Sequence, residues 1–586
     1  MAPENFIEVS FEVANKVGGI HQVIKSKTGF MQQQYGENYL AIGYLDEENA
    51  SKEFVPREEN PYSHLFQKLE QKYGIRCKYG VWKIPGEPKT ILVDPTHLKK
   101  PADEIKEELW EKQKIDSLNA GREFDEPLEW SYAVSKLLEE LKEYRDGDTV
   151  VQLHEWLSGP VQFFNELPTV FTTHATVLGR ALSNSNHNLN KIVEKKQDVS
   201  SKPEELGVKA KHQIEKASAY EAEVFTTVSQ TTGEETHALL DKRPDKILEN
   251  GLDFNEFPGL GELSYKHIEK KEKMKRFLRA YFKPYYDVDL EDDPRILFIS
   301  GRYEYRNKGI DIFIEALSQI NEREGEDFFV FFFIPGDTKK ENPEVIENLS
   351  LYDELEEYTE SKIDSLKETM LNSVTSTRPL EEAIQASIQK DSHEIENLRK
   401  DFKAKKGDKP PISAYELNNP EDQILNKLYK EGLTNEENDR VKVIHYPSYL
   451  SVGDKMLSMN YNEAVMAASA GIFPSYYEPW GYTPVETAAN GAISITTDLA
   501  GFGQYIKQKT SKKERKGIKV LDRKTNTDQE SVNQLSDMIE DITSYSKTEI
   551  TERKHNARRI AQLTSWENLG HKYIEAHEEA VKQKQR

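Results

Sequence analysis

Cysteine is nearly absent from this chain of 586 residues, and it has no long hydrophobic run. The single cysteine, Cys77, excludes an internal disulfide and a metal cluster held by several thiolates, and it predicts a reducing cytoplasm as the setting. The longest apolar stretch, near residues 328–336, is far shorter than the roughly 20 residues that a membrane-spanning helix requires. The first residues hold no basic segment followed by an apolar one, so we expect neither a signal peptide nor a membrane partner.

Acidic residues outnumber basic ones, and two common phosphate-binding motifs are missing. Lys and Arg total 79 against 102 Asp and Glu, which gives a formal net charge of −23. A nucleic-acid partner is therefore not expected, because proteins of that class present a basic face, although a local basic pocket for an anionic ligand stays compatible. No G-x-G-x-x-G follows the first strand and no G-x-x-x-x-G-K-S/T occurs, so a dinucleotide-binding or P-loop protein loses its main support.

Short, almost continuously apolar segments recur along the chain and predict strands that are buried on both faces of a parallel sheet. Helix-like segments such as residues 310–321 lie between many of them. This alternation predicts an α/β fold. The predicted strands are residues 149–154, 168–174, 224–229, 295–301, 328–336, 441–446, 470–475 and 492–498.

A break in the pattern at residues 258–293 predicts two α/β domains. A helical, basic segment precedes a connector there, and we place the domains at residues 1–283 and 284–545, followed by helices over 546–586 that pack back on the body. Residues 339–438 interrupt the second domain and are charge-rich without strand signals. Apolar stripes at Leu351, Leu355 and Tyr358 and at Ile363, Leu366 and Met370 predict helices there. This insertion is either packed on its own domain or an arm for self-association.

Polar and charged residues follow several predicted strands, at the positions where open parallel sheets bind ligands. His154-Glu155-Trp156 follows one strand, and the stretch from His174 to Arg180 follows the next. Gly301–Gly309 and Pro474–Glu486 follow two strands of the second domain. We therefore expect both halves of the chain to contribute to one cleft.

Two basic or glycine-rich segments are suited to a diphosphate. Arg302 offers a planar fork of donors and Lys308 a mobile charge, although either could be an ordinary surface residue. The segment Lys16-Val17-Gly18-Gly19 would let backbone N–H groups approach a ligand, although paired glycines are also common in turns.

The stretch Pro474–Glu486 holds two carboxylates eight residues apart. Thr483 as N-cap, Pro484 as first helical residue and Glu486 as third would form a capping box, and a helix N-terminus also attracts phosphate. Glu478 precedes Pro479 and follows a buried strand, so its carboxylate needs a partner, for which a polar ligand is a candidate. Paired carboxylates also occur in glycoside hydrolases, but the capping geometry favours a cradle for a donor sugar.

Several stretches together resemble the animal and fungal type of glycogen synthase, a family of retaining glycosyltransferases that use UDP-glucose. They occur in the order of the family and span nearly the whole chain. The matching stretches are residues 11–24, 153–160, 171–180, 223–235, 301–317, 439–450, 473–487 and 495–503.

The resemblance implies two Rossmann-like domains that face a central cleft, with the C-terminal helix crossing back to the first domain. It implies that the insertion helps to build a homo-oligomer, with a tetramer as the family pattern. Arg302 and Lys308 would hold the donor diphosphate, and Tyr461 would stack on uracil. The residues assigned to the donor nucleotide are Lys16, Gly18, Gly19, Tyr461, Tyr482, Thr483 and Glu486.

The implied reaction extends the non-reducing end of an α-1,4-glucan with retention of configuration. His174 and Arg180 would flank the reacting centre, Glu478 would bind the donor glucose and Glu486 the ribose. Basic groups would stabilise the departing UDP, so neither a metal ion nor another cofactor is expected.

One departure from the family concerns regulation. Family members carry a dense run of arginines that senses glucose 6-phosphate, whereas residues 548–566 keep only Arg553, Lys554, Arg558 and Arg559. We therefore expect weak or no activation by that sugar phosphate.

Three alternatives stay open at this point. The first is another retaining sugar transferase with a small acceptor, and the second is a catalytically silent glycan-binding or scaffold protein. The third, an NAD-linked oxidoreductase, lacks its glycine fingerprint.

Overall fold

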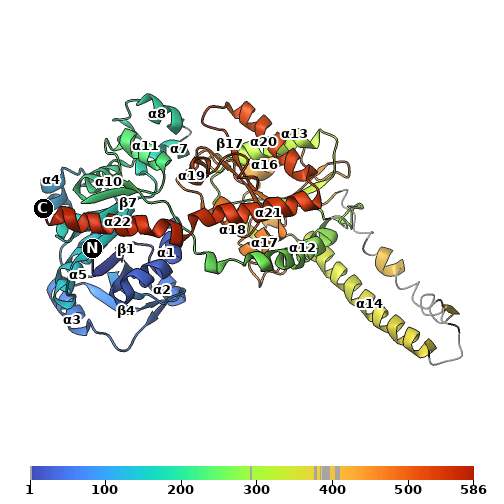
Figure 1. Cartoon of the computed structure of the whole chain (residues 1–586), viewed down its shortest axis with the longest axis horizontal. Helices are drawn as coiled ribbons and strands as arrows, with labels where there is room; N and C mark the ends of the chain where they lie inside the picture. The colour runs from blue at the N-terminus through green and yellow to red at the C-terminus, as the bar shows by residue number, and fades with distance from the viewer. Residues whose placement is uncertain are drawn as a thin grey trace.

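The computed structural model describes residues 3–16, 18–185, 187–290, 293–374, 396–400 and 409–586, together with 379, 381–382, 385 and 402. Two α/β bodies lie side by side along the long axis, and helix α14 (Pro343–Val374) projects from the second body (Figure 1). The predicted fold class, α/β with two Rossmann-like domains, is confirmed. No helix of the described chain is long and apolar enough to cross a membrane.

The first body is built on a nine-stranded sheet that is parallel except around β4. Its strands are β1 (Asn5–Val9), β2 (Tyr39–Tyr44), β3 (Phe54–Pro56), β4 (Arg76–Trp82), β5 (Lys89–Asp94), β6 (Thr149–His154), β7 (Thr169–Thr173), β8 (Val224–Thr227) and β9 (Lys246–Ile247). They lie in the order β3-β4-β5-β2-β1-β6-β7-β8-β9. Strand β1 is central and wholly buried, so Glu8 within it is a carboxylate in the core.

Helices cover this sheet and connect its parallel strands, as right-handed crossovers require. They are α1 (Gly19–Tyr35), α2 (Glu47–Glu53), α3 (Ser63–Tyr73), α4 (Ala102–Gln113), α5 (Arg122–Leu141), α6 (Glu155–Ser158), α7 (Val177–Asn184), α8 (Leu189–Lys195), α9 (Lys202–Glu205), α10 (Lys209–Glu221) and α11 (Gln230–Leu239).

The second body has an all-parallel six-stranded sheet in the order β14-β11-β10-β15-β16-β17. Its strands are β10 (Arg295–Ser300), β11 (Phe328–Phe333), β14 (Val441–His445), β15 (Ala470–Ile472), β16 (Ile493–Thr497) and β17 (Ile518–Leu521). Its helices are α12 (Leu260–Phe282), α13 (Ile310–Asn321), α16 (Gln423–Lys430), α17 (Tyr461–Ala467), α18 (Tyr482–Ala489), α19 (Gly501–Lys509), α20 (Asp528–Ser544) and α21 (Lys547–Ala561).

The ends of the two bodies differ in detail from the predicted boundaries. The boundary at 283/284 falls at the end of α12, whose buried residues Met274 and Phe277 belong to the core of the second body. Within residues 546–586, α21 also packs on the second body, through Ala557 and Ile560. Only the last helix, α22 (Trp566–Lys584), packs on the first body, so the C-terminal segment spans both (Figure 1).

The described part of the insertion at residues 339–438 holds helices, as predicted, but it also holds strands, which were not predicted. Strands β12 (Thr338–Glu341) and β13 (Tyr415–Leu417) form an antiparallel pair. Strand β12 is charged and largely exposed and β13 is only three residues long, so neither produces an apolar pattern that would predict a strand.

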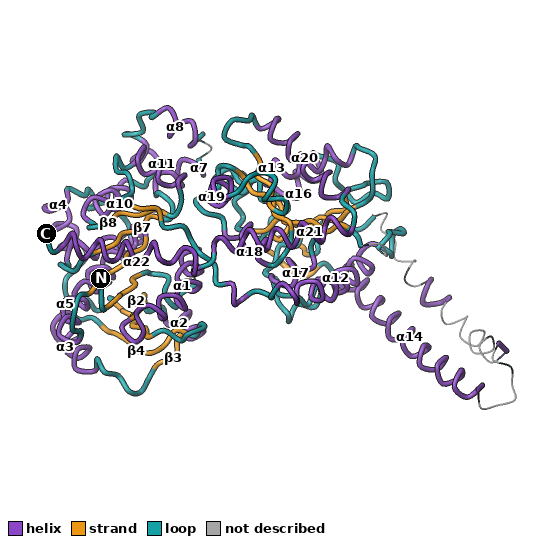
Figure 2. The backbone as a smooth tube through the Cα atoms, viewed as in Figure 1, coloured by secondary structure: helices purple, strands orange, loops and turns teal. Residues whose placement is uncertain are grey.

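Helix α14 is packed on its own domain at its start and exposed farther along. Val345 and Leu349 near its start are buried against the second body, whereas Ile363, Met370 and Leu371 farther along are exposed. The distal half stands away from the body (Figure 2). Self-association through it stays a prediction.

Candidate functional site

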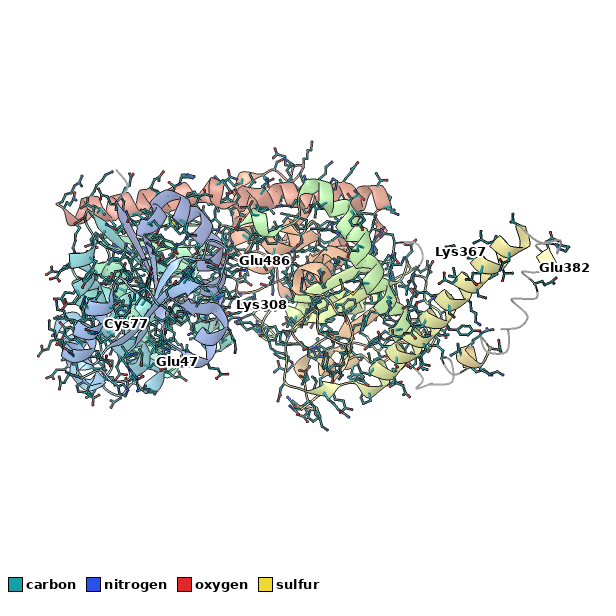
Figure 3. The ribbon with its side chains drawn as sticks, turned by 90° about the horizontal axis from the view of Figure 1, so that it is seen from below. Glu47, Cys77, Lys308, Lys367, Glu382 and Glu486 are labelled. Carbon is teal, nitrogen blue, oxygen red and sulfur yellow. The ribbon has the colours of Figure 1, made fainter. Side chains whose placement is uncertain are left out.

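The predicted site residues gather where the two bodies meet. The loop after β10 and the loop after β15 come from the second body, and α7 after β7 comes from the first. Ser183 Oγ at the end of α7 donates to Asn307 Oδ1 over 2.7 Å, which joins the two bodies directly. Figure 3 shows Lys308 and Glu486 on the side of the second body that faces the first.

Lys308 and Glu478, both predicted site residues, form an ion pair of 2.5 Å between Nζ and Oε2. Both side chains are largely buried, with 13% and 16% exposed. The backbone of Glu478 is fixed as well, because Gly501 N donates to its carbonyl oxygen over 3.1 Å. Two groups expected to hold different parts of a ligand thus pair with each other.

The two loops that carry this pair are bound to each other through their backbones. Tyr476 N donates to the Asn307 carbonyl over 2.8 Å. Gly309 has φ +68°, and a Cβ at this position would lie 2.1 Å from the carbonyl oxygen of Pro474. Only glycine allows this close approach, so Gly309 sets the distance between the loops.

Arg302 lies at the mouth of the site rather than inside it. Its side chain is 65% exposed, and its guanidinium pairs with Glu304 over 2.9 Å. A guanidinium held only by a neighbouring surface carboxylate is available to an anionic ligand.

Arg180 is the basic group of the first body at this site. It lies near the start of α7, where its backbone N–H donates to the Thr176 carbonyl over 3.0 Å, and its side chain forms no hydrogen bond or ion pair with the described residues. Although burial lowers the pKa of its guanidinium, the carboxylates of Glu155, Glu304 and Glu215 raise it above its ordinary value. Arg180 is therefore a charged donor without a fixed partner.

A buried carboxylate of the first body, Glu155, holds the backbone at His174. Glu155 accepts hydrogen bonds from the backbone N–H groups of His174 and Ala175, over 3.1 and 3.0 Å, and adopts φ +64°. Such backbone strain is concentrated at functional sites. Burial raises the pKa of Glu155 to about 7. The sequence pointed to this position after β6 but suggested no role for it.

The Glu12 carboxylate is bound at the N-terminus of helix α1. Glu12 accepts hydrogen bonds of 2.9 Å from both Gly18 N and His21 N, and burial raises its pKa. Gly19 begins the helix and Lys16 is exposed, while Val17 lies outside the described residues. A donor phosphate at the predicted glycine pair would therefore share these N–H groups with Glu12, which the sequence did not reveal.

The predicted capping box at Thr483 is wrong. Helix α18 begins at Tyr482, after Gly481 with φ +104°, and no side chain caps it. Glycine supplies the left-handed turn that starts the helix, so Thr483 falls inside the first turn. The Glu486 carboxylate consequently has no hydrogen-bond partner in the described chain. Burial and then Glu256 raise its pKa to about 7.

The two tyrosines assigned to the nucleotide have different surroundings. The hydroxyl of Tyr461, at the start of α17, lies 2.9 Å from Ser300 Oγ at the end of β10. Tyr482 donates to the carbonyl of Gly251 in the first body over 3.2 Å, so its polar end is used between the bodies.

The donor set at the site is basic and carboxylic rather than metal-binding. Across the described residues no group of three or more His, Cys, Asp or Glu side chains is arranged to hold a metal ion. The expectation that no metal or other cofactor takes part stays a prediction.

Comparisons with known proteins show the family of the chain. A family model for glycogen synthase matches residues 8–585. The chain is 33% identical to glycogen (starch) synthase isoform 2 of Saccharomyces cerevisiae, over 98% of this chain and 86% of the yeast protein. It is 32% identical to the liver glycogen (starch) synthase of Homo sapiens, over 97% of this chain and 82% of the human one.

A solved structure supports the fold independently. The catalytic domain of starch synthase IV from Arabidopsis thaliana, bound to ADP and acarbose, has a TM-score of 0.55 with this chain at 14% identity, covering 99% of both. At that identity the likeness concerns the fold alone. The family match over nearly the whole chain is more specific, and on it the chain belongs to the glycogen synthase family.

Proposed function

We propose that this protein is a glycogen synthase that transfers glucose from UDP-glucose to the non-reducing end of an α-1,4-glucan, with retention of configuration. Family membership over residues 8–585 supports the reaction class. The observation that carries the assignment to this site is the Lys308–Glu478 pair at the junction of the two bodies, where Arg180 of the first body and Arg302 of the second both act on the Glu12 carboxyl.

Donor binding would exchange the partners of this pair. The diphosphate of UDP-glucose would take Lys308 and Arg302, and hydroxyls of the glucose would take Glu478. A preformed ion pair keeps both side chains in one rotamer, so little reorganisation is needed when the donor arrives. As the glycosidic bond to UDP breaks, negative charge grows on the diphosphate, and the cations already placed there stabilise it.

The nucleoside would occupy the side of the site formed by α17 and α18. The Glu486 carboxylate has no protein partner in the described chain and would accept hydrogen bonds from the ribose hydroxyls. Tyr461 would stack its ring on the uracil while its hydroxyl stays bonded to Ser300. Lys25 and Lys16 of the first body act against burial and Glu256 and lower the pKa of Glu486, so they favour the ionised carboxylate that this role needs.

The remaining assignments complete the proposal. The chain's own cations replace a metal ion, no cofactor takes part, and the protein acts in the cytoplasm. Projecting helix α14 with its exposed apolar residues supports a homo-oligomer, for which the family pattern suggests a tetramer.

An acceptor experiment tests this function. The protein is given UDP-glucose with glycogen, with maltooligosaccharides, or with glucose and glucose 6-phosphate as small acceptors, and both UDP release and glucose incorporation are measured. We expect incorporation into glycogen and maltooligosaccharides. Transfer only to a small acceptor would identify a different transferase, and no transfer from either UDP-glucose or ADP-glucose would indicate a silent glycan-binding protein.

A further inference from the structure

A chain of buried hydrogen bonds runs from the central strand of the first body to His174. Glu8 in β1 and Lys27 in α1 have no exposed side-chain surface and pair over 2.5 Å. His154 Nε2 lies 2.9 Å from Glu8 Oε1. His154 Nδ1 lies 2.9 Å from His174 Nε2, at the site.

The partners of Glu8 decide which nitrogen of His154 carries a proton. Glu8 also accepts a hydrogen bond from the hydroxyl of Tyr39 over 2.7 Å. Although burial raises the pKa of the Glu8 carboxyl, Lys27 and His154 lower it to about 2. An ionised carboxylate only accepts hydrogen bonds, so His154 Nε2 must be the N–H donor.

The proton position on His154 in turn decides the proton position on His174. Burial lowers the pKa of His154 and outweighs the hydrogen bond to Glu8, which raises it, and Lys27 adds to the lowering, so the neutral imidazole is favoured. A neutral ring with a proton on Nε2 has a lone pair on Nδ1. His154 Nδ1 therefore accepts, and His174 Nε2 donates. Burial also lowers the pKa of His174 well below its ordinary range, so its Nδ1 carries the lone pair.

The second ring nitrogen of His174, Nδ1, has no hydrogen-bond partner in the described chain. It is not among the buried polar atoms that lack a partner, so it keeps contact with solvent. The backbone N–H of His174 is held separately by Glu155. The ring is thus fixed at one edge and open at the other.

We propose that Glu8 and His154 are positioning residues that hold His174 in the tautomer with the proton on Nε2, so that His174 Nδ1 accepts a hydrogen bond from one hydroxyl of the donor glucose. The inference rests on the proposed function for its ligand, but its tautomer can be tested without turnover. It makes Glu8, which touches no substrate, a determinant of donor recognition.

The variant His154→Leu tests the proposal with little risk to the fold. It removes the hydrogen bond to His174, while Glu8 keeps Lys27 and Tyr39 as partners, so no charge is stranded in the core. The matched control is His577→Phe. His577 belongs to the same buried network, through Tyr35 at 2.8 Å and Gln152 at 3.4 Å, but it does not hydrogen bond with His174.

Four UDP-deoxyglucoses, each lacking one hydroxyl of the transferred sugar, serve as probes in transfer to maltooligosaccharides. In the wild type and in His577→Phe we expect one analogue to lose kcat/KM on the order of tenfold, the effect of one hydrogen bond. In His154→Leu the loss with that analogue should become clearly smaller, because only part of the His174 rings keep an acceptor Nδ1, while the other three analogues keep their wild-type ratios. If His154→Leu discriminates as the wild type does, the proposal is overturned.

A second measurement does not require glucose transfer, so it tests the tautomer even if the proposed function is wrong. ¹⁵N NMR of histidine-labelled protein, with His174→Asn used to assign the signal, reports which nitrogen of His174 is protonated. We expect the proton on Nε2 in the wild type and a mixture of tautomers in His154→Leu. A proton on Nδ1 in the wild type would overturn the proposal even if glucose transfer is confirmed.

Discussion

Tyr477 in the second body donates a hydrogen bond to Glu235 in the first body, with 3.2 Å between its hydroxyl and Glu235 Oε1. Tyr477 directly precedes Glu478, and Glu235 also accepts from the backbone N–H of Thr176 over 3.3 Å. A carboxylate of one body is thereby connected to the loop that carries the sugar-binding candidate of the other. Burial raises the pKa of Glu235 to about 7.

This raised pKa makes the contribution of Glu235 to stability dependent on pH. The folded protein holds the proton more tightly than the unfolded chain, whose ordinary value is 4.5, so Glu235 costs stability as pH rises from about 4.5 to about 7 and no more above that. We expect the free energy of unfolding of Glu235→Gln, relative to the wild type, to increase by about 1–3 kcal/mol over this window. Buried histidines are common to both proteins and cancel.

Urea titrations of the two proteins at several pH values measure this difference. A difference that stays constant between pH 4.5 and 7 would show that the carboxyl of Glu235 titrates normally in the folded protein.

Gly309→Ala should damage the site by pushing two loops apart. The added Cβ would collide with the Pro474 carbonyl at 2.1 Å, and the backbone is already in the left-handed region. Gly432→Ala is the matched control, because Gly432 has φ +74° and no atom within 4 Å of the added Cβ. The control should lose about 1–2 kcal/mol of stability from backbone strain alone.

We expect Gly309→Ala to lose more stability than Gly432→Ala and to lose transfer activity as well. Thermal unfolding and glucose incorporation into glycogen measure the two effects. Equal losses in both variants would mean that the contact with Pro474 is not needed.

Arg302→Ala should reduce transfer by a factor on the order of 10² to 10³, as expected when a cation that stabilises the leaving group is removed. Its stability should not change, because the side chain is 65% exposed and pairs only with Glu304. Arg57→Ala is the control, since Arg57 is 52% exposed and pairs with Glu87 on the surface of the first body. Near-normal turnover of Arg302→Ala would remove Arg302 from the site.

Glucose 6-phosphate should activate this protein weakly or not at all. Lys554 is buried and donates to the Ala468 carbonyl over 2.8 Å, and burial lowers its pKa to about 7. Arg553 stacks on the ring of Tyr545 at 3.8 Å, and Arg558 donates to the Pro258 carbonyl over 3.3 Å. Three of the four basic side chains thus have internal contacts. Transfer rates with and without the sugar phosphate test this, and a several-fold rise would contradict it.

The strands of the sheet centres could be predicted from the sequence because burial on both faces produces continuous apolar runs. Strands β14 and β16 were predicted within one residue at each end. The short strand β12 could not be, since its residues are charged and paired rather than buried. The start of α18 was misplaced because Gly481 and Thr483 give competing start signals, and only the observed φ of Gly481 decides between them.

The candidate site could likewise be predicted only in part from the sequence. The rule that ligands bind beyond parallel strands identified His174, Arg180, Lys308 and Glu478, since each follows a strand. The same rule pointed to His154, but it gave no sign of Glu8 or of the contact between the two residues. Glu8 and His154 are 146 residues apart in sequence, and a pairing at that distance leaves no local pattern.

The most direct test of the account is glucose transfer from UDP-glucose to glycogen by the wild type and by Glu478→Gln. Glu47→Gln is the control, because Glu47 pairs with Lys78 over 2.7 Å on the surface of the first body, away from the site (Figure 3). The account predicts transfer by the wild type and by Glu47→Gln, and a loss on the order of 10² or more in Glu478→Gln. Transfer by Glu478→Gln at the wild-type rate would contradict the central claim that the Lys308–Glu478 pair receives the donor sugar.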